Sequence, residues 1–150
     1  MHIQLYTDGA ARGNPGKGGY GVVLIYGNHR KELSGGYTHT TNNRMELMAV
    51  IEGLKAIKKQ HLPVTVYSDS KYVIDSVEKG WLQNWIKTDF KGGKKNKDLW
   101  LEFYRVSRPF QITFKWVKGH ADNPNNNRCD ELATSAADGK ELVVDEGYEG

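Results

Sequence analysis

The stretch GKGGYGVVLIYG, residues 16–27, decides between two fold classes. Its glycines form a G-x-G-x-x-G pattern, which in a nucleotide-binding oxidoreductase follows a strand and opens a helix. Here an apolar, β-branched run, GVVLIYG, comes next, and such a run is typical of a strand. The glycines therefore indicate a turn that lets a hairpin return, with room for close approach of the backbone. The oxidoreductase interpretation depends on this pattern alone, and we reject it.

Outward from this hairpin, the period of the apolar residues alternates between 2 and 3.6. Residues 40–60 carry one apolar helical stripe, formed by Leu47, Val50, Ile51, Leu54 and Ile57. Asn42 or Asn43 is expected to cap the start of this helix. Strands are expected over 2–8, 19–27, 29–37, 64–69 and 110–117, and further helices from about 70 to 80, over 81–87, over 98–108 and around Cys129. This order, without repeats or linkers, predicts an α/β layer structure around a mixed, five-stranded sheet.

Length and composition are those of one globular domain. The chain has 150 residues, of which 38% are hydrophobic and 26% charged. The N-terminal residues MHIQLYTD have no signal-peptide pattern, and no apolar run approaches the roughly 20 residues that span a membrane. The single cysteine, Cys129, fits a reducing compartment. We therefore expect a cytoplasmic monomer with no membrane partner.

Charge is unevenly distributed along the chain. The net charge is +3, but the last ten residues, ELVVDEGYEG, carry four acids and no base, so the remainder is more basic. The lysine-rich loop, residues 87–97, has five lysines against one aspartate. A basic body with such a loop favours a polyanionic partner over a merely solvated surface.

Four carboxylates are candidates for a metal site. Asp8 and Asp69 each lie near the end of a predicted strand, and parallel neighbours would bring them to one edge of the sheet. Glu46 and Asp130 both border a buried helical stripe. Each could instead serve as a turn residue, a helix cap or a surface acid. Gathered together they would repel one another unless a cation compensated, and oxygen ligands favour Mg²⁺ or Mn²⁺.

Five motifs, in this order and spacing, resemble type 1 ribonuclease H of the bacterial kind. They are YTDGAARGNPGKGGYG (6–21), TTNNRMEL (40–47), YSDSKYV (67–73), KGWLQNW (79–85) and WVKGHADNPNNNRCDELA (116–133). The resemblance runs from about residue 3 to residue 138. It implies a ribonuclease H-like fold with helices on both faces of the five-stranded mixed sheet. We therefore expect a catalytic domain over residues 1–139 and an acidic C-terminal tail over 140–150.

The resemblance also implies an activity, because family members hydrolyse the RNA strand of an RNA/DNA hybrid. It assigns Asp8, Glu46, Asp69 and Asp130 to the catalytic, metal-binding carboxylates. Two Mg²⁺ ions, or Mn²⁺ ions, would activate a water that attacks in line and leaves a 5′-phosphate and a 3′-hydroxyl. His120 matches a loop histidine that moves a proton or helps to release product, and a pKa near 6.5 suits that role.

Further residues match substrate contacts of the family. Asn14, Asn42 and Asn43 stand where amides read the hybrid's minor groove, since an amide can both donate and accept. Lys71 stands where relatives often carry glutamine, so a phosphate contact is expected in place of a polar one. His39 stands where an arginine is common, which predicts a weaker or pH-dependent grip on DNA phosphate.

The remaining matches lie along the backbone of the hybrid. Thr41, Arg44 and Asn84 fall at or near positions that hold backbone phosphates in the family. Trp81 and Trp85 match aromatic residues of the DNA-strand channel, beside the lysine-rich loop, although tryptophans four residues apart often place one in the core.

Two other functions remain open from the residues alone. One is a non-catalytic module that binds hybrids or RNA through its basic surface, and the other is a different nuclease or an integrase with the same fold and metal chemistry. All four carboxylates would repel phosphate unless metals were bound, which disfavours the first. Activity on duplex DNA would favour the second.

Overall fold

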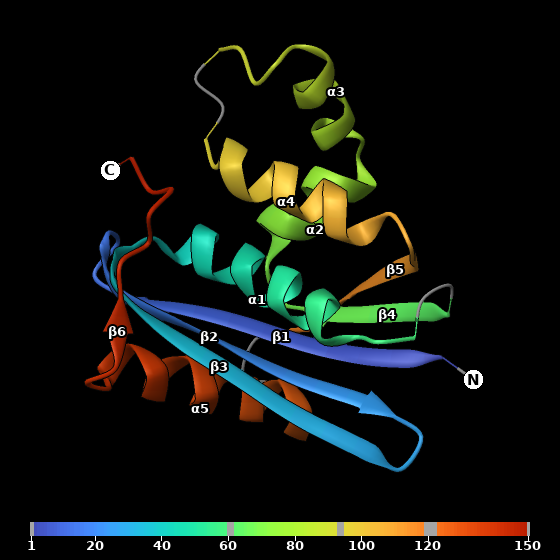
Figure 1. Ribbon diagram of the computed structural model, residues 1–150, viewed down its shortest axis with the longest axis vertical. Coiled ribbons are helices and arrows are strands. Elements are labelled where there is room, and N and C mark those ends of the chain that lie inside the picture. Colours follow the sequence, from blue (N-terminus) through green and yellow to red (C-terminus); the bar gives the residue numbers. More distant parts are fainter. Residues whose placement is uncertain (1, 60–61, 93–94, 119–122, 150) are drawn as a thin grey trace.

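The computed structural model describes residues 2–59, 62–92, 95–118 and 123–149, and within them six strands form one mixed sheet (Figure 1). The sheet order is β5-β4-β1-β2-β3-β6. The strands are β1 (Ile3–Arg12), β2 (Gly16–Tyr26), β3 (His29–Thr40), β4 (Pro63–Ser68), β5 (Gln111–Trp116) and β6 (Leu142–Val143). The helices are α1 (Asn42–Ala56), α2 (Lys71–Glu78), α3 (Trp81–Lys87), α4 (Lys97–Ser107) and α5 (Pro124–Asp138).

Helices lie on both faces of this sheet, as predicted. Helices α1, α2 and α4 cover one face with α3 beyond them, and α5 covers the other (Figure 1). The main core lies between the sheet and α1, α2 and α4, where Trp100 is fully buried. None of the helices in the described ranges is long and apolar enough to cross a membrane.

The expected fold differs from the structure by one strand. Strand β6 has only two residues, and it pairs in parallel with β3 through Gly36 and Tyr37. Two residues are too few to show an alternating period, so the sequence pattern could not reveal it. The expected cap of α1 is also corrected, because the hydroxyl of Thr41 accepts the hydrogen bond from the Arg44 N–H, and Asn42 and Asn43 belong to the helix itself.

Strand directions follow from the connections. Strands β1, β2 and β3 form an antiparallel meander, since short turns join them. Helix α1 crosses back over the sheet, so β4 runs parallel to β1, and β5 runs parallel to β4. The parallel pairing of β1 with β4 ends at Tyr6 opposite Tyr67. Asp8 and Asp69 each lie two residues beyond this last pair, so the two residues lie side by side just past the end of the parallel pairing.

The three glycines of the G-x-G-x-x-G pattern lie inside β2 rather than in the turn that was expected, and no helix follows them. At Gly21, an added Cβ would stand 2.2 Å from the carbonyl oxygen of Cys129, on α5. The backbone of α5 therefore packs directly on the backbone of β2, which only glycine permits. Of the three glycines in the pattern, Gly21 thus serves the packing of a helix on the sheet, whereas an added Cβ at Gly16 would meet the Arg12 carbonyl oxygen of the neighbouring strand.

Candidate active site

Three of the four predicted carboxylates meet at one point. Asp8 lies on β1, Glu46 lies in α1, and Asp69 directly follows β4. One ligand oxygen from each lies within 4.8 Å of the others. Asp130, on α5, lines the same groove but does not belong to this close group. The chain thus brings carboxylates from three parts of the fold to one edge of the sheet.

The groove that contains them, here called the carboxylate groove, has a volume of about 470 Å³ and a largely polar lining. Its walls are Asp8, Gly9, Ala10, Ala11, Asn42, Asn43, Glu46, Asp69, Ser70, Lys71, Tyr72, Asn126, Asn127 and Asp130. An open, polar groove of this kind suits an extended polar substrate better than a small apolar ligand.

Gly9 holds two of the carboxylates in place. Its N–H donates to Asp8 Oδ1 at 2.9 Å and to Glu46 Oε1 at 2.8 Å. A Cβ at this position would stand 2.4 Å from the backbone nitrogen of Glu46, so α1 approaches β1 here at backbone contact. This close approach explains why Glu46 is 4% exposed, deeper than the margin position that its helical period predicts.

Burial sets the protonation of this pair. It raises the pKa of Asp8 to about 7, and the charge of Asp69 adds to that rise. Burial, followed by the charge of Asp8, raises the pKa of Glu46 well above its usual range. Glu46 Oε2 is buried and has no hydrogen-bond partner among the described residues. A proton would satisfy such an acceptor, and a cation could take the place of that proton.

This exchange predicts a pH dependence for the metal-free protein. The raised pKa of Asp8 means that the folded state binds more protons than the unfolded state between about pH 4 and pH 7, so stability falls as pH rises through that window. We expect the Tm in chelator to be several degrees lower at pH 8 than at pH 5.5, at about 2–4 °C per kcal/mol for a chain of this size. Thermal unfolding at a series of pH values measures it. A chelated Asp8→Asn variant should show a flatter profile, and an equally steep one would contradict this assignment.

The donor set fits a hard divalent ion. Asp8, Glu46 and Asp69 supply carboxylate oxygens only, which Mg²⁺ and Mn²⁺ prefer. A bound cation would satisfy Glu46 Oε2 and relieve the repulsion that raises the pKa of both buried acids.

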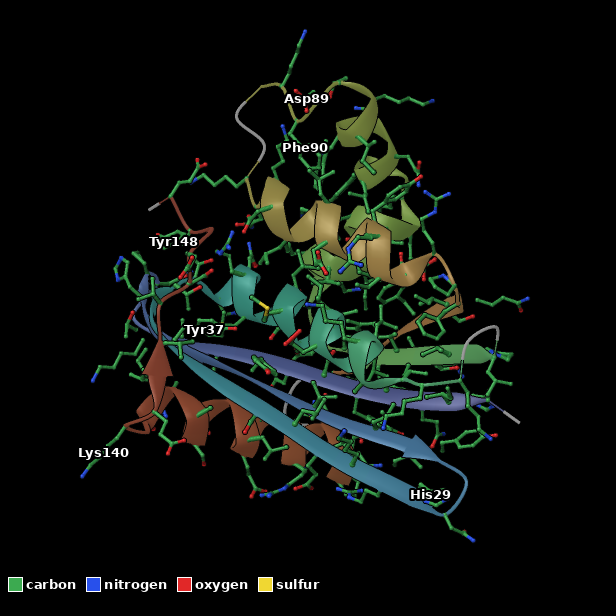
Figure 2. The ribbon with its side chains drawn as sticks, viewed as in Figure 1. His29, Tyr37, Asp89, Phe90, Lys140 and Tyr148 are labelled. Carbon is green, nitrogen blue, oxygen red and sulfur yellow. The ribbon has the colours of Figure 1, made fainter. Side chains whose placement is uncertain are left out.

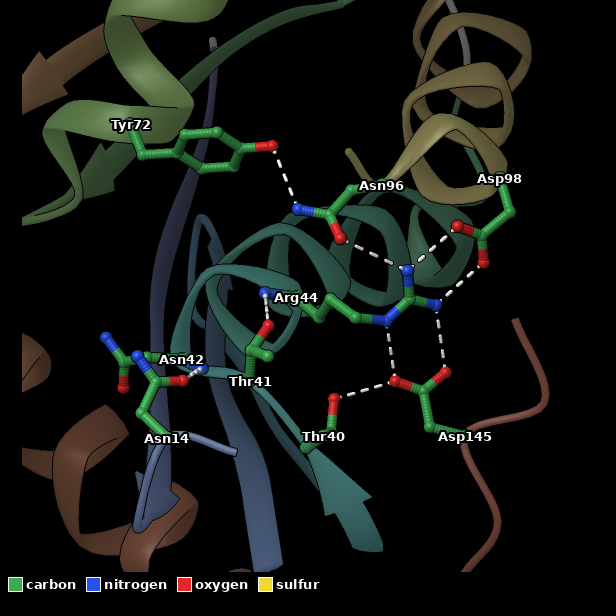
Figure 3. Close-up of polar contacts among 9 residues, drawn as sticks. All are labelled: Asn14, Thr40, Thr41, Asn42, Arg44, Tyr72, Asn96, Asp98 and Asp145. Carbon is green, nitrogen blue, oxygen red and sulfur yellow. Dashed lines mark hydrogen bonds and ion pairs between the residues drawn. The ribbon is translucent and has the colours of Figure 1, made fainter. Parts of the chain in front are cut away.

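The amides predicted to bind substrate lie beside this site. Asn14, Asn42 and Asn43 are all exposed. Asn14 Oδ1 accepts from the N–H of Asn42 at 3.0 Å, which ties the β1–β2 turn to the first residue of α1 (Figure 3). A second groove, of about 370 Å³, adjoins it and is lined by Asn14, Thr41, Asn43, Tyr72, Trp85, Lys95, Asn96 and Tyr148.

Arg44 occupies a different environment from its neighbours. Its side chain is 2% exposed, and its guanidinium lies between Asp145 and Asp98 (Figure 3). Nε and Nη2 donate to Asp145 at 2.7 and 2.9 Å, and Nη1 and Nη2 donate to Asp98 at 2.8 and 2.7 Å. Nη1 also donates to Asn96 at 3.3 Å. With both edges of the guanidinium occupied, Arg44 meets the second groove through Asn96.

The other predicted contacts are more scattered. Trp81 and Asn84 are exposed on α3. Trp85 is half-buried, with its ring 6.0 Å from that of Trp100 and 6.3 Å from that of Phe90, which lies between α3 and α4 (Figure 2). Trp85 therefore contributes to the core and also lines the second groove. His120 lies outside the described residues.

Several groove residues escaped the sequence patterns. Asn96 immediately precedes α4, donates from Nδ2 to the Tyr72 hydroxyl at 3.0 Å and lines the second groove. Asn126 is 3% exposed, lines the carboxylate groove and has a buried Oδ1 without a partner among the described residues. The NPNNN run around Asn126 signals only a helix start, so nothing in it separates a buried amide from a capping one.

Three comparisons with known proteins agree. The family model described as RNase H matches residues 1–138. The chain is 52% identical to a protein named Ribonuclease H from Syntrophus aciditrophicus, covering 97% of this chain and 86% of the relative. It is 51% identical to a Ribonuclease H from Aeromonas salmonicida, covering 99% and 97%.

Solved structures show the same likeness. LC9-RNase H1, described as a type 1 RNase H with the type 2 active-site motif, is 31% identical with a TM-score of 0.82, over 98% of this chain and 78% of that one. LC11-RNase H1, solved in complex with an RNA/DNA hybrid, is 27% identical with a TM-score of 0.69, over 91% and 96%.

Proposed function

Because this chain belongs to the ribonuclease H family of endonucleases, we propose that it hydrolyses the RNA strand of RNA/DNA hybrids in a metal-dependent reaction, leaving 5′-phosphate and 3′-hydroxyl ends. One observation carries the metal dependence. Asp8, Glu46 and Asp69 bring their oxygens within 4.8 Å of one another, two of them buried, with Glu46 Oε2 left without a partner among the described residues. This arrangement is stable near neutral pH only with a cation or bound protons.

The residues would divide the work as follows. Asp8, Glu46 and Asp69 would hold the metal, and Asp130, which lines the same groove, is kept as the fourth proposed metal ligand. Two Mg²⁺ ions, when bound, lower the pKa of an attacking water and stabilise the charge that develops on the phosphate. The Gly9 N–H keeps two carboxylates aligned while protons and metal exchange. We keep His120 as the proposed proton-transfer residue.

The surface beside the groove supports a hybrid as substrate. The exposed amides of Asn14, Asn42 and Asn43 can donate to and accept from base edges and 2′-hydroxyls in a minor groove. LC11-RNase H1, which shares this fold, binds an RNA/DNA hybrid. One copy of the chain supplies both the carboxylates and the amides of the proposed site, so we propose that the protein acts as a monomer. The buried, unpaired thiol of Cys129 supports action in the reducing cytoplasm.

A substrate panel tests the proposal. We expect cutting of the RNA strand in an RNA/DNA hybrid with Mg²⁺, and no cutting with chelator, because the carboxylates repel the phosphate without a metal. Gel analysis of labelled hybrid, RNA duplex, DNA duplex and single-stranded RNA measures it, and end-labelling identifies the new termini. Equal cutting of single-stranded RNA, or full activity in chelator, would overturn the proposal. Cutting of duplex DNA would instead indicate another nuclease of this fold, and tight binding without cutting would indicate a binding module.

A further inference from the structure

Lys71 and Trp116 form a pair at the rim of the carboxylate groove. Lys71 is the first residue of α2 and lines the groove two residues after Asp69. Its ammonium nitrogen lies 4.2 Å from the centroid of the Trp116 ring. This distance is well inside the roughly 6 Å at which an aromatic face attracts a cation.

Trp116 is itself fixed by the sheet. It is the last residue of β5 and pairs with Ser68, the last residue of β4. Its indole N–H donates to the main-chain carbonyl of Asp69 at 3.2 Å. The side chain nevertheless remains 48% exposed, and a large apolar residue in that state does little for the core. Its ring therefore serves as a support whose position is tied to the strand that ends at the carboxylate groove.

The placement of Lys71 is unfavourable for the helix that it begins. A cation in the first turn of a helix meets the positive end of the helix dipole. Within the described residues, Lys71 makes no ion pair with a carboxylate. The lysine is thus held by an aromatic face with its charge still available to an anion.

We propose that Trp116 is a positioning residue that holds the Lys71 ammonium at the rim of the carboxylate groove, where it binds a backbone phosphate of the strand being cleaved. The inference rests on the proposed function, since a phosphate in this groove is that of the substrate. Trp116 selects the outward, groove-facing arrangement of a flexible side chain before the substrate arrives, which lowers the entropic cost of the contact. The N–H bond to Asp69 keeps this support in register with the carboxylate.

Hybrid binding as a function of salt tests the pair. The measurement uses a fluorescent RNA/DNA hybrid and the Asp8→Asn background, so that binding is read whether or not the chain cleaves. We expect Lys71→Gln to weaken binding about 3- to 10-fold, the effect of losing one phosphate contact. The negative slope of log K against log salt concentration should become shallower by about 0.7–0.9, because one phosphate contact is lost. Trp116→Leu should likewise weaken hybrid binding and make the salt dependence of binding shallower.

Non-additivity and rescue separate positioning from a merely structural role. Lys71→Gln combined with Trp116→Leu should bind no worse than Lys71→Gln alone, because both changes remove one interaction. Trp116→Phe keeps an aromatic face and should retain most of the salt slope. In the cleavage-competent chain, Lys71→Gln should raise KM and leave kcat within about twofold.

Lys31→Gln is the matched control. It removes one positive charge from β3 close to the β2–β3 turn, which His29 marks in Figure 2, and Lys31 does not line the carboxylate groove. Additive effects of Lys71→Gln and Trp116→Leu, or an unchanged salt slope in Trp116→Leu, would overturn the inference. Binding of the hybrid with no cleavage by the unmodified chain would overturn the proposed function, and the salt slopes would then still decide whether the Lys71–Trp116 pair contacts a phosphate of the bound hybrid.

Discussion

Replacing Asp8 by asparagine is expected to lower the rate of hybrid cleavage by at least about 10³-fold, which corresponds to about 4 kcal/mol of lost transition-state stabilisation. The amide has nearly the shape of the carboxylate, so the loss follows from charge. Asp8 is one of three acids whose oxygens lie within 4.8 Å, and the proposed metal depends on their summed charge. Single-turnover cleavage of a labelled hybrid in Mg²⁺ measures the change.

The same substitution should leave the fold intact or strengthen it. The raised pKa of Asp8 reports that burial and the charge of Asp69 disfavour its ionised form. Removing that charge therefore removes an unfavourable burial, and the Tm in chelator at pH 8 should be equal or higher. Asp75→Asn is the matched control, since Asp75 lies on α2, does not line the groove and forms an ion pair with Lys79 at 3.7 Å. Cleavage above one tenth of the normal rate in Asp8→Asn would refute the assignment of Asp8 as a metal ligand.

The second large effect is expected at the C-terminal tail, where Asp145→Ala should lower the free energy of unfolding by about 3–5 kcal/mol. Asp145 is 7% exposed and accepts from Arg44 and from the Thr40 hydroxyl, the latter at 2.7 Å. Removing it leaves a buried guanidinium with Asp98 as its one remaining carboxylate partner among the described residues. Urea unfolding at pH 7 measures the loss, and Glu146→Ala, an exposed neighbour, should change stability by less than about 0.5 kcal/mol.

The pH dependence of this effect has the opposite sign to that of Asp8. Burial alone would raise the pKa of Asp145, but hydrogen bonds from Arg44 and Thr40 outweigh it and lower the pKa. A lowered pKa in the folded state contributes stability above the unfolded value near 4 and loses it as pH falls through the folded value. The difference in free energy of unfolding between the unmodified protein and Asp145→Ala should therefore be largest at pH 6–8 and shrink below about pH 4. A constant difference down to pH 3 would show that the carboxylate charge plays no part.

The period of the apolar residues and the residues typical of turns were sufficient to predict most of the strands and helices. The change from GVVLIYG to the helical stripe of residues 40–60 predicted the meander and its crossover helix, and the structure confirms both. The family resemblance is confirmed by the family model over residues 1–138. Parallel pairing of the strands before Asp8 and Asp69, the condition for bringing both carboxylates to one edge of the sheet, is also confirmed.

The remainder depends on contacts between distant parts of the chain. Arg44 matches a phosphate contact of the family, and no local pattern links it to its partner Asp145, which lies 101 residues away. The segment ELVVDEGYEG was predicted only as an acidic tail, and nothing local shows that Asp145 is the buried one among its acids. The depth of Glu46 depends on the missing side chain of Gly9, on another element. Long-range pairing and close backbone approach leave no local period to detect.

Contact between β2 and α5 through Gly21 has a consequence for the placement of Asp130. Asp130 immediately follows Cys129, whose carbonyl oxygen would lie 2.2 Å from a Cβ on Gly21. The distance of Asp130 from the other carboxylates therefore depends on the missing side chain of Gly21, although β2 itself carries none of these acids. No exchange of side chains along α5 can restore that spacing once the strand acquires a Cβ, because the obstructing atoms belong to the main chain of the helix.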